Sequence, residues 1–108
     1  MTRILLLEDD PDQLDIRKLL LESAGYEVHA SSSALEAATV APDSDLILMD
    51  LVPGWDELIA GLPATTRVIV LSGRDATEAL TARSACVLRK PYPTRSLMET
   101  ISRVCAGA

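Results

Sequence analysis

Short, wholly apolar runs alternate with more polar segments along the chain. Four of these runs, residues 4–7, 46–49, 68–71 and 87–88, each lead into a polar or charged residue. Uninterrupted apolar runs of this length are typical of parallel strands that are buried on both faces of a sheet. Helical patterns separate the runs, so the chain alternates strand and helix five times. This order predicts an α/β fold with one doubly wound, five-stranded parallel sheet.

The first helix is predicted by the residues at its two ends. Asp10 is a good N-terminal cap, and Pro11 suits the first helical turn. Gly25 is typical of the residue that follows a helix. One apolar face of this helix is marked by residues spaced four apart, namely Ile16, Leu20 and Ala24.

The other elements are shorter or less strongly marked. Expected are a strand over 26–30, brief helices over 34–39, 55–61 and 76–83, and a fifth strand over 87–89. Thr94 is expected to cap the last helix of the chain. The buried stripe of that helix would consist of Leu97, Ile101, Val104 and Cys105. Trp55 is expected to cover the short helix over 55–61, and His29, the only histidine, to be exposed.

Composition limits the class of protein. The 108 residues are 48% hydrophobic, which fits one globular domain without a linker or repeat. The net charge of −6 gives no electrostatic case for direct binding to nucleic acid or to an anionic membrane. No apolar run approaches the roughly 20 residues that span a bilayer. Cys86 and Cys105 lack metal-ligand spacing and are expected to be buried free thiols, so we expect a cytoplasmic domain.

The polar residues that end the apolar runs are chemically related. Glu8 and Asp9 follow the first run and Asp50 follows the run over 46–49. Ser72 and Lys90 follow the last two runs. Because ligands bind at the carboxyl ends of strands in such sheets, we expect these side chains to lie at one edge.

This set of side chains suits a hard cation and a phosphoryl group. Carboxylate oxygens are ligands that Mg²⁺ prefers, and an aspartate can attack phosphorus to form an acyl phosphate. A hydroxyl and an ammonium group can stabilise the transferring phosphoryl oxygens. The plainer alternative is that the acidic triplet after the first run is only a solvated turn and a helix cap. Asp50, Ser72 and Lys90, each at the end of its own run, disfavour that alternative.

Four motifs bring the sequence close to a known family. They are ILLLEDDP, DLILMDLVPGWD, VIVLSG and LRKPYP, in this order and over the whole length. With this set the chain resembles the receiver domain of response regulators in two-component signalling, the CheY-like family. The resemblance implies a flavodoxin-like sheet with strand order 2-1-3-4-5. It also implies a single receiver domain over residues 1–108 with no output domain.

The resemblance further implies a role for each polar residue at the sheet edge. Asp50 would be the phosphoacceptor, assisted by Lys90 and Ser72. The metal, Mg²⁺ or Mn²⁺, would be held by Glu8, Asp9, Asp50 and the backbone carbonyl of Val52. A sensor histidine kinase or a phosphotransfer protein would donate the phosphoryl group, and a downstream protein target would recognise the phosphorylated domain.

Several features depart from the family pattern. Pro53 stands three residues after Asp50, where the family usually has a proline four residues after, so the loop is one residue short. The segments of helices three and four are also shorter than usual. Val87 occupies the position of a Tyr or Phe whose ring changes rotamer on phosphorylation, and valine is stiff about χ1.

Three functions are therefore weighed. The first is a Mg²⁺-dependent receiver that accepts a phosphoryl group on Asp50 and slowly hydrolyses it, without turnover of an external substrate. The alternative is a phosphorylation-independent protein-binding module of receiver fold, which the short loop and Val87 favour. A small-molecule phosphatase is disfavoured because Val52 stands where such enzymes carry a second aspartate as general acid.

Overall fold

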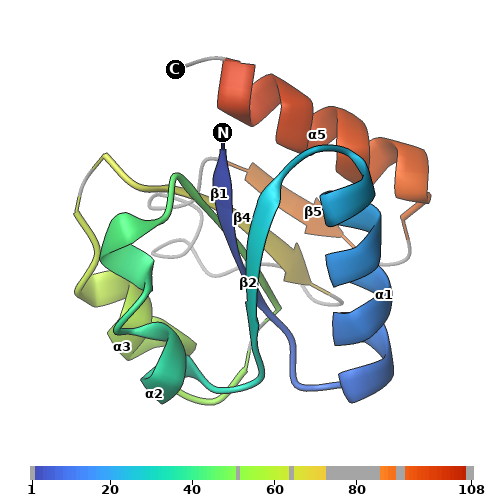
Figure 1. Cartoon of the computed structure of the whole chain (residues 1–108). Helices are drawn as coiled ribbons and strands as arrows, with labels where there is room; N and C mark the ends of the chain where they lie inside the picture. The colour runs from blue at the N-terminus through green and yellow to red at the C-terminus, as the bar shows by residue number, and fades with distance from the viewer. Residues whose placement is uncertain (1, 51, 64, 73–85, 90–91, 107–108) are drawn as a thin grey trace.

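The computed structural model describes residues 2–50, 52–63, 65–72, 86–89 and 92–106 (Figure 1). The strands are β1 Arg3–Leu7, β2 Glu27–Ser31, β3 Leu46–Asp50, β4 Arg67–Ser72 and β5 Cys86–Arg89. The helices are α1 Pro11–Ser23, α2 Ala34–Ala37, α3 Trp55–Ala60 and α5 Thr94–Ala106, with a 3-10 turn at Ala41–Asp43. The helix predicted over 76–83 lies outside the described residues.

The five strands form one parallel sheet in the order β2-β1-β3-β4-β5. This confirms the predicted fold class and strand order. The order reverses between β1 and β3, which are direct neighbours with Leu7 opposite Met49. Parallel neighbours need helical crossovers, and these cover both faces of the sheet. In Figure 1, α1 and α5 lie on one side of the sheet, and α2 and α3 lie on the other.

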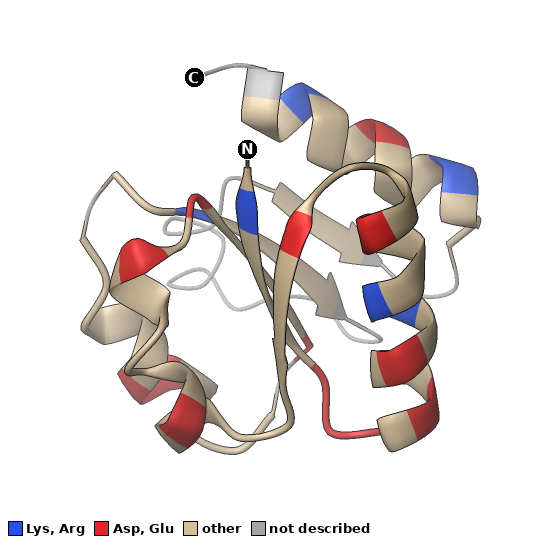
Figure 2. Cartoon of the chain, in the orientation of Figure 1, with Lys and Arg blue, Asp and Glu red and all other residues tan. Residues whose placement is uncertain are grey.

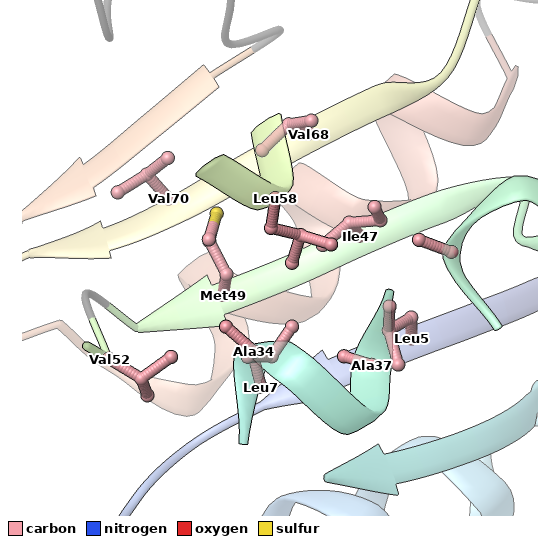
Figure 3. Packing of buried hydrophobic residues seen from close by; sticks show 11 residues of the cluster. Leu5, Leu7, Ala34, Ala37, Ile47, Met49, Val52, Leu58, Val68 and Val70 are labelled. Atoms are coloured by element: carbon pink, nitrogen blue, oxygen red, sulfur yellow. The ribbon is translucent and has the colours of Figure 1, made fainter. Parts of the chain in front are cut away.

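Successive strand residues point to opposite faces, so each strand contributes to two cores. One core joins β-strand residues to Leu21 of α1 and to Leu97 and Ile101 of α5. The other joins Leu5, Leu7, Ile47, Met49, Val68 and Val70 to Ala34, Ala37 and Leu58 of the short helices (Figure 3). The central strands are fully buried on both faces, which explains their continuous apolar runs.

The helix ends follow the predicted signals, with small differences. The Asp10 side chain caps α1, accepting from the Asp12 amide at 3.0 Å. The prediction for Thr94 was wrong by one position, because Thr94 already belongs to α5 and the Leu97 amide donates to the Pro93 carbonyl at 3.3 Å. Within the described ranges, no helix has the length and apolarity needed to cross a membrane.

The buried face of α1 differs from the one marked by the sequence pattern. Ile16 is 60% exposed, whereas Arg17 is 9% exposed and Leu21 is fully buried. The buried face of α1 is therefore formed by Leu14, Arg17 and Leu21, and Leu14 is partly packed in the same core as Leu21. This face includes one charged residue, Arg17. A charged side chain is ordinarily placed in water, which is why the pattern of apolar residues alone selected the wrong face.

Some single-residue expectations can also be compared with the structure. His29 is exposed, as expected. Trp55 is the first residue of α3 and packs, half-buried, against the core beneath that helix. The expectation of buried thiols was wrong in degree, because Cys86 and Cys105 are free but only half-buried. Cys86 is the first residue of β5, and Cys105 lies near the end of α5.

Candidate functional site

The candidate site lies at the carboxyl edge of the sheet, where β1 and β3 end side by side. Leu7 pairs with Met49, so Glu8 and Asp50 are the next residues on neighbouring strands. The register between β3 and β4 places Asp50 opposite Leu71. Figure 2 shows the acidic segment that leaves β1 and enters the first turn of α1. The topology therefore brings together the carboxylates that the sequence predicted at this edge.

An open cleft of about 610 Å³ lies over this edge. Its acidic lining consists of Glu8, Asp9, Asp10 and Asp50. The rest of the wall is built by α1 and by the start of α5, from Gln13, Ile16, Arg17, Leu20, Tyr92, Thr94 and Leu97. The cleft thus joins the end of β1 and β3 to two helices that are far apart in sequence.

Glu8 is the most buried carboxylate of the cleft, at 2% exposure. Its Oε1 accepts from the Asp10 amide at 3.2 Å, and its Oε2 accepts from Arg17 Nη1. Burial raises the pKa of Glu8 above its ordinary value, and the nearby Asp50 raises it further. The Asp10 amide and the Arg17 guanidinium act in the opposite direction, because both stabilise the carboxylate.

Arg17 is the residue of this site that the sequence analysis missed. Its guanidinium donates from Nη1 to Glu8 and from Nη2 to Tyr92 Oη at 2.9 Å. Arg17 therefore connects α1 to the end of β1 and to the segment that precedes α5. Its spacing of four before the buried Leu21 was the only signal in the sequence, and it was outweighed by its charge. Tyr92 also lines the cleft.

The loop after Asp50 is tightly closed. The Val52 amide donates to the Asp50 carbonyl at 2.9 Å, and the Trp55 amide donates to the Val52 carbonyl at 3.1 Å. Val52 itself is 1% exposed. Both bonds are short-range, and they lie in a segment that is one residue shorter than the family pattern. The carbonyl that was expected to face a metal already accepts a hydrogen bond at the start of α3.

The remaining predicted residues are placed as follows. Asp9 is exposed and Asp50 is half-buried, both at the cleft. Ser72 is the last residue of β4 and pairs in register with Arg89, but its side chain is not among those described. Lys90, together with Pro91, lies outside the described residues.

The donor set suits a divalent cation only in part. Across the described ranges, no three His, Cys, Asp or Glu side chains converge closely enough to hold a metal ion. Asp9 and Asp50 line the cleft beside Glu8, which is paired with Arg17, and beside Asp10, which caps α1. Mg²⁺ commonly takes one or two carboxylates and completes its shell with water and phosphate oxygens. The chemistry of these two residues therefore fits Mg²⁺ or Mn²⁺.

The chain is similar to curated response regulators. It is 27% identical over 115 residues to the DNA-binding dual master transcriptional regulator RpaA of Synechocystis, a match covering 94% of this chain and 48% of the relative. It is 26% identical over 109 residues to the response regulator SaeR of Staphylococcus epidermidis, with 91% and 48% covered. The chain thus spans about half the length of the curated relatives it matches. No family model matches it.

Solved receiver domains share the fold over nearly the whole chain. A CheY-like receiver domain of Methanospirillum hungatei is 28% identical with a TM-score of 0.84, covering 99% of this chain and 95% of that one. The receiver domain of the sensor histidine kinase PA1611 of Pseudomonas aeruginosa is 25% identical with a TM-score of 0.81, covering 97% and 98%. That structure has a magnesium ion coordinated in its active site cleft.

The fold, the acidic edge and these likenesses point to one class of protein. The chain resembles the receiver domains of two-component response regulators over nearly its whole length, and its sheet has their CheY-like order 2-1-3-4-5. Its loop after Asp50 and its helices α2 and α3 are short, and its cleft holds an arginine.

Proposed function

We propose that this receiver domain accepts a phosphoryl group on Asp50 from a sensor histidine kinase or a phosphotransfer protein. The observation that supports this most strongly is the position of Asp50 at the end of β3, beside Glu8 at the end of β1 and within a cleft that opens to solvent. A cytoplasmic domain acting on a downstream protein target follows from the same proposal.

Each of these residues has a separate role in the proposed transfer of the phosphoryl group. A carboxylate oxygen of Asp50 attacks the phosphorus of a phosphohistidine, the P–N bond breaks, and the imidazole leaves with the bonding electrons and takes up a proton. A bound Mg²⁺ or Mn²⁺ supplies charge neutralisation at the phosphoryl oxygens. Asp9 and Asp50 would hold that ion, and Lys90 and Ser72 are proposed to contact the phosphoryl oxygens.

Loss of the phosphoryl group restores the starting state. Water attacks phosphorus, the P–O bond to Asp50 breaks, and inorganic phosphate leaves behind the free carboxylate. We propose that this hydrolysis is slow, and that the domain turns over no external substrate beyond its own acyl phosphate.

Phosphoryl uptake from a small-molecule phosphodonor tests the proposal directly. Intact-mass spectrometry should detect one added phosphoryl group per chain in the presence of Mg²⁺ and none after chelation. Asp50→Asn should abolish the adduct. Asp43→Asn, which removes an exposed carboxylate from the 3-10 turn, is the matched control and should leave uptake unchanged. Uptake that persists in Asp50→Asn would refute Asp50 as acceptor.

A phosphorylation-independent binding module remains the second candidate. Two contacts favour it, namely the pairing of Arg17 with Glu8 and the hydrogen bond from the Trp55 amide to the Val52 carbonyl, because both engage groups that a metal ion would need. Trp55 is half-buried at the start of α3, so its emission reports on this loop. A saturable response to Mg²⁺ and then to beryllofluoride, both absent in Asp50→Asn, would favour the receiver. Silence in both titrations, with no phosphoryl uptake, would favour the module.

A further inference from the structure

Arg17 is a buried cation inside an acidic cleft. It is 9% exposed, and the Glu8 side chain with which it pairs is 3% exposed. Arginine is almost never buried unless it is paired, because removing a charge from water carries a large free-energy penalty. The pair of Arg17 and Glu8 is therefore a buried ion pair in the wall of the cleft. The pair of Arg3 and Glu27 is instead a surface ion pair, because its side chains are 60% and 58% exposed.

Both carboxylate oxygens of Glu8 are already engaged. Oε1 accepts from the Asp10 amide at 3.2 Å, and Oε2 accepts from Arg17 Nη1. The second arm of the guanidinium donates to Tyr92 Oη at 2.9 Å, which fixes its direction. A metal ion approaching Asp9 and Asp50 would therefore meet a Glu8 whose Oε2 is already paired with a positive charge.

We infer that Arg17 sets the metal affinity of the cleft by competing with the divalent cation for Glu8. This rests on the proposed function only in taking the cleft as a Mg²⁺ site. When the cation takes Oε2 of Glu8, Arg17 has to give up that contact. When Arg17 keeps it, the cation has only Asp9 and Asp50 and is also repelled by the guanidinium.

Tyr92 affects the same competition because it holds Arg17 in place. It belongs to the segment between β5 and α5, and its hydroxyl is the acceptor that holds the far arm of Arg17. Arginine binds two acceptors through a rigid fork, so the loss of one contact loosens the other. Removing the Tyr92 hydroxyl should therefore ease the release of Glu8 without changing any charge in the cleft.

Calorimetric titration with MgCl₂ at pH 8 and fixed ionic strength measures the inferred effect. Arg17→Met removes the competing charge and should lower the Kd for Mg²⁺ by about tenfold or more, as expected for one unit charge removed from beside the ion. Arg3→Met is the matched control, since it breaks a surface pair at the opposite end of β1. Its Kd should change by less than about twofold.

A double-mutant cycle separates competition for Glu8 from a general charge effect. In the Glu8→Gln background, Arg17→Met should shift the Kd far less than in the parent, because the shared carboxylate is gone. An equal shift in both backgrounds overturns the inference, as does an unchanged Kd in Arg17→Met. Absence of Mg²⁺ binding in both the parent and Arg17→Met also overturns it.

Tyr92→Phe keeps the test decisive if Arg17→Met does not fold. This variant should lower the Kd for Mg²⁺ by about two- to threefold, and an unchanged Kd overturns the inference. Phosphoryl uptake is read separately by mass. An Arg17-dependent Kd without uptake would sink the proposed function alone, whereas normal uptake with an Arg17-independent Kd would sink this inference alone.

Discussion

Gly54 follows the tight turn after Asp50, and we expect its replacement to be the most damaging among the described glycines. Its φ of 87° lies in the left-handed region, where a side chain is disfavoured. A Cβ placed there would also lie 3.3 Å from the Cβ of Ala34 in α2. The change Gly54→Ala therefore combines backbone strain with a contact that pushes α2 and α3 apart.

Two other glycines allow these costs to be separated. Gly25 has a φ of 96°, and an added methyl group would meet nothing within 4 Å, so Gly25→Ala carries the backbone cost alone, about 1–2 kcal/mol. Gly61 ends α3 with a φ of −87°, and the nearest neighbour of an added methyl group would be at an ordinary 3.7 Å. Gly61→Ala should stabilise by about 0.4–1 kcal/mol, because the unfolded chain loses freedom. Gly54→Ala should cost about 2–3 kcal/mol.

Urea unfolding followed by far-UV circular dichroism gives the free energy of unfolding for the parent and the three variants. The expected order of stability is Gly61→Ala, parent, Gly25→Ala, Gly54→Ala. A cost for Gly61→Ala equal to that of Gly54→Ala would refute the reasoning from φ. A cost for Gly54→Ala no larger than that of Gly25→Ala would refute the argued contact with Ala34.

Three further predictions address the helix cap, the core and the response to alkali. Asp10→Ala removes the α1 cap and should cost about 1 kcal/mol in urea unfolding, whereas Asp10→Asn should retain most of the stability. Leu48→Ala opens a cavity at a fully buried position and should lower the free energy of unfolding by about 2–5 kcal/mol. Leu35→Ala, at an 84% exposed position, is the control and should change it by less than about 0.5 kcal/mol. Equal costs for the two variants would contradict the assigned core. Burial raises the pKa of the Cys105 thiol and of the Tyr26 phenol above their usual values of 9.0 and 10.0. The unfolded chain then releases these protons first, so the free energy of unfolding should fall as pH rises above those values, and a flat profile there would contradict the assignment.

The sheet could be predicted from the sequence because its signals are local and redundant. The apolar runs, the cap at Asp10 and the proline at the first turn of α1 each specify an element without reference to the rest of the fold. Helix lengths were less predictable. The helix expected over 34–39 ends at Ala37, since the chain then turns into a 3-10 segment before β3.

The placement of carboxylates at the sheet edge was predictable from the sequence, whereas the pairing of Glu8 was not. Strand ends placed Glu8 and Asp50 together, as the topology requires. The spacing of Arg17 before Leu21 was too weak a signal to show that Arg17 turns inward, because charge favours water and only a buried carboxylate nearby reverses that preference. The hydrogen bond from Trp55 to the Val52 carbonyl was equally hidden, since it depends on how the shortened loop closes.

The described helices on the two faces of the sheet differ in length, and this has a consequence for motion. α1 and α5 have 13 residues each, whereas α2 has four and α3 has six. Helices this short have little stability of their own and persist only through the surface they cover. We therefore expect amide hydrogens of α2 and α3 to exchange with solvent through local openings, well before those of the central strands. Asp50 therefore lies between β3, a buried central strand, and α3, a short helix that we expect to open earlier than that strand.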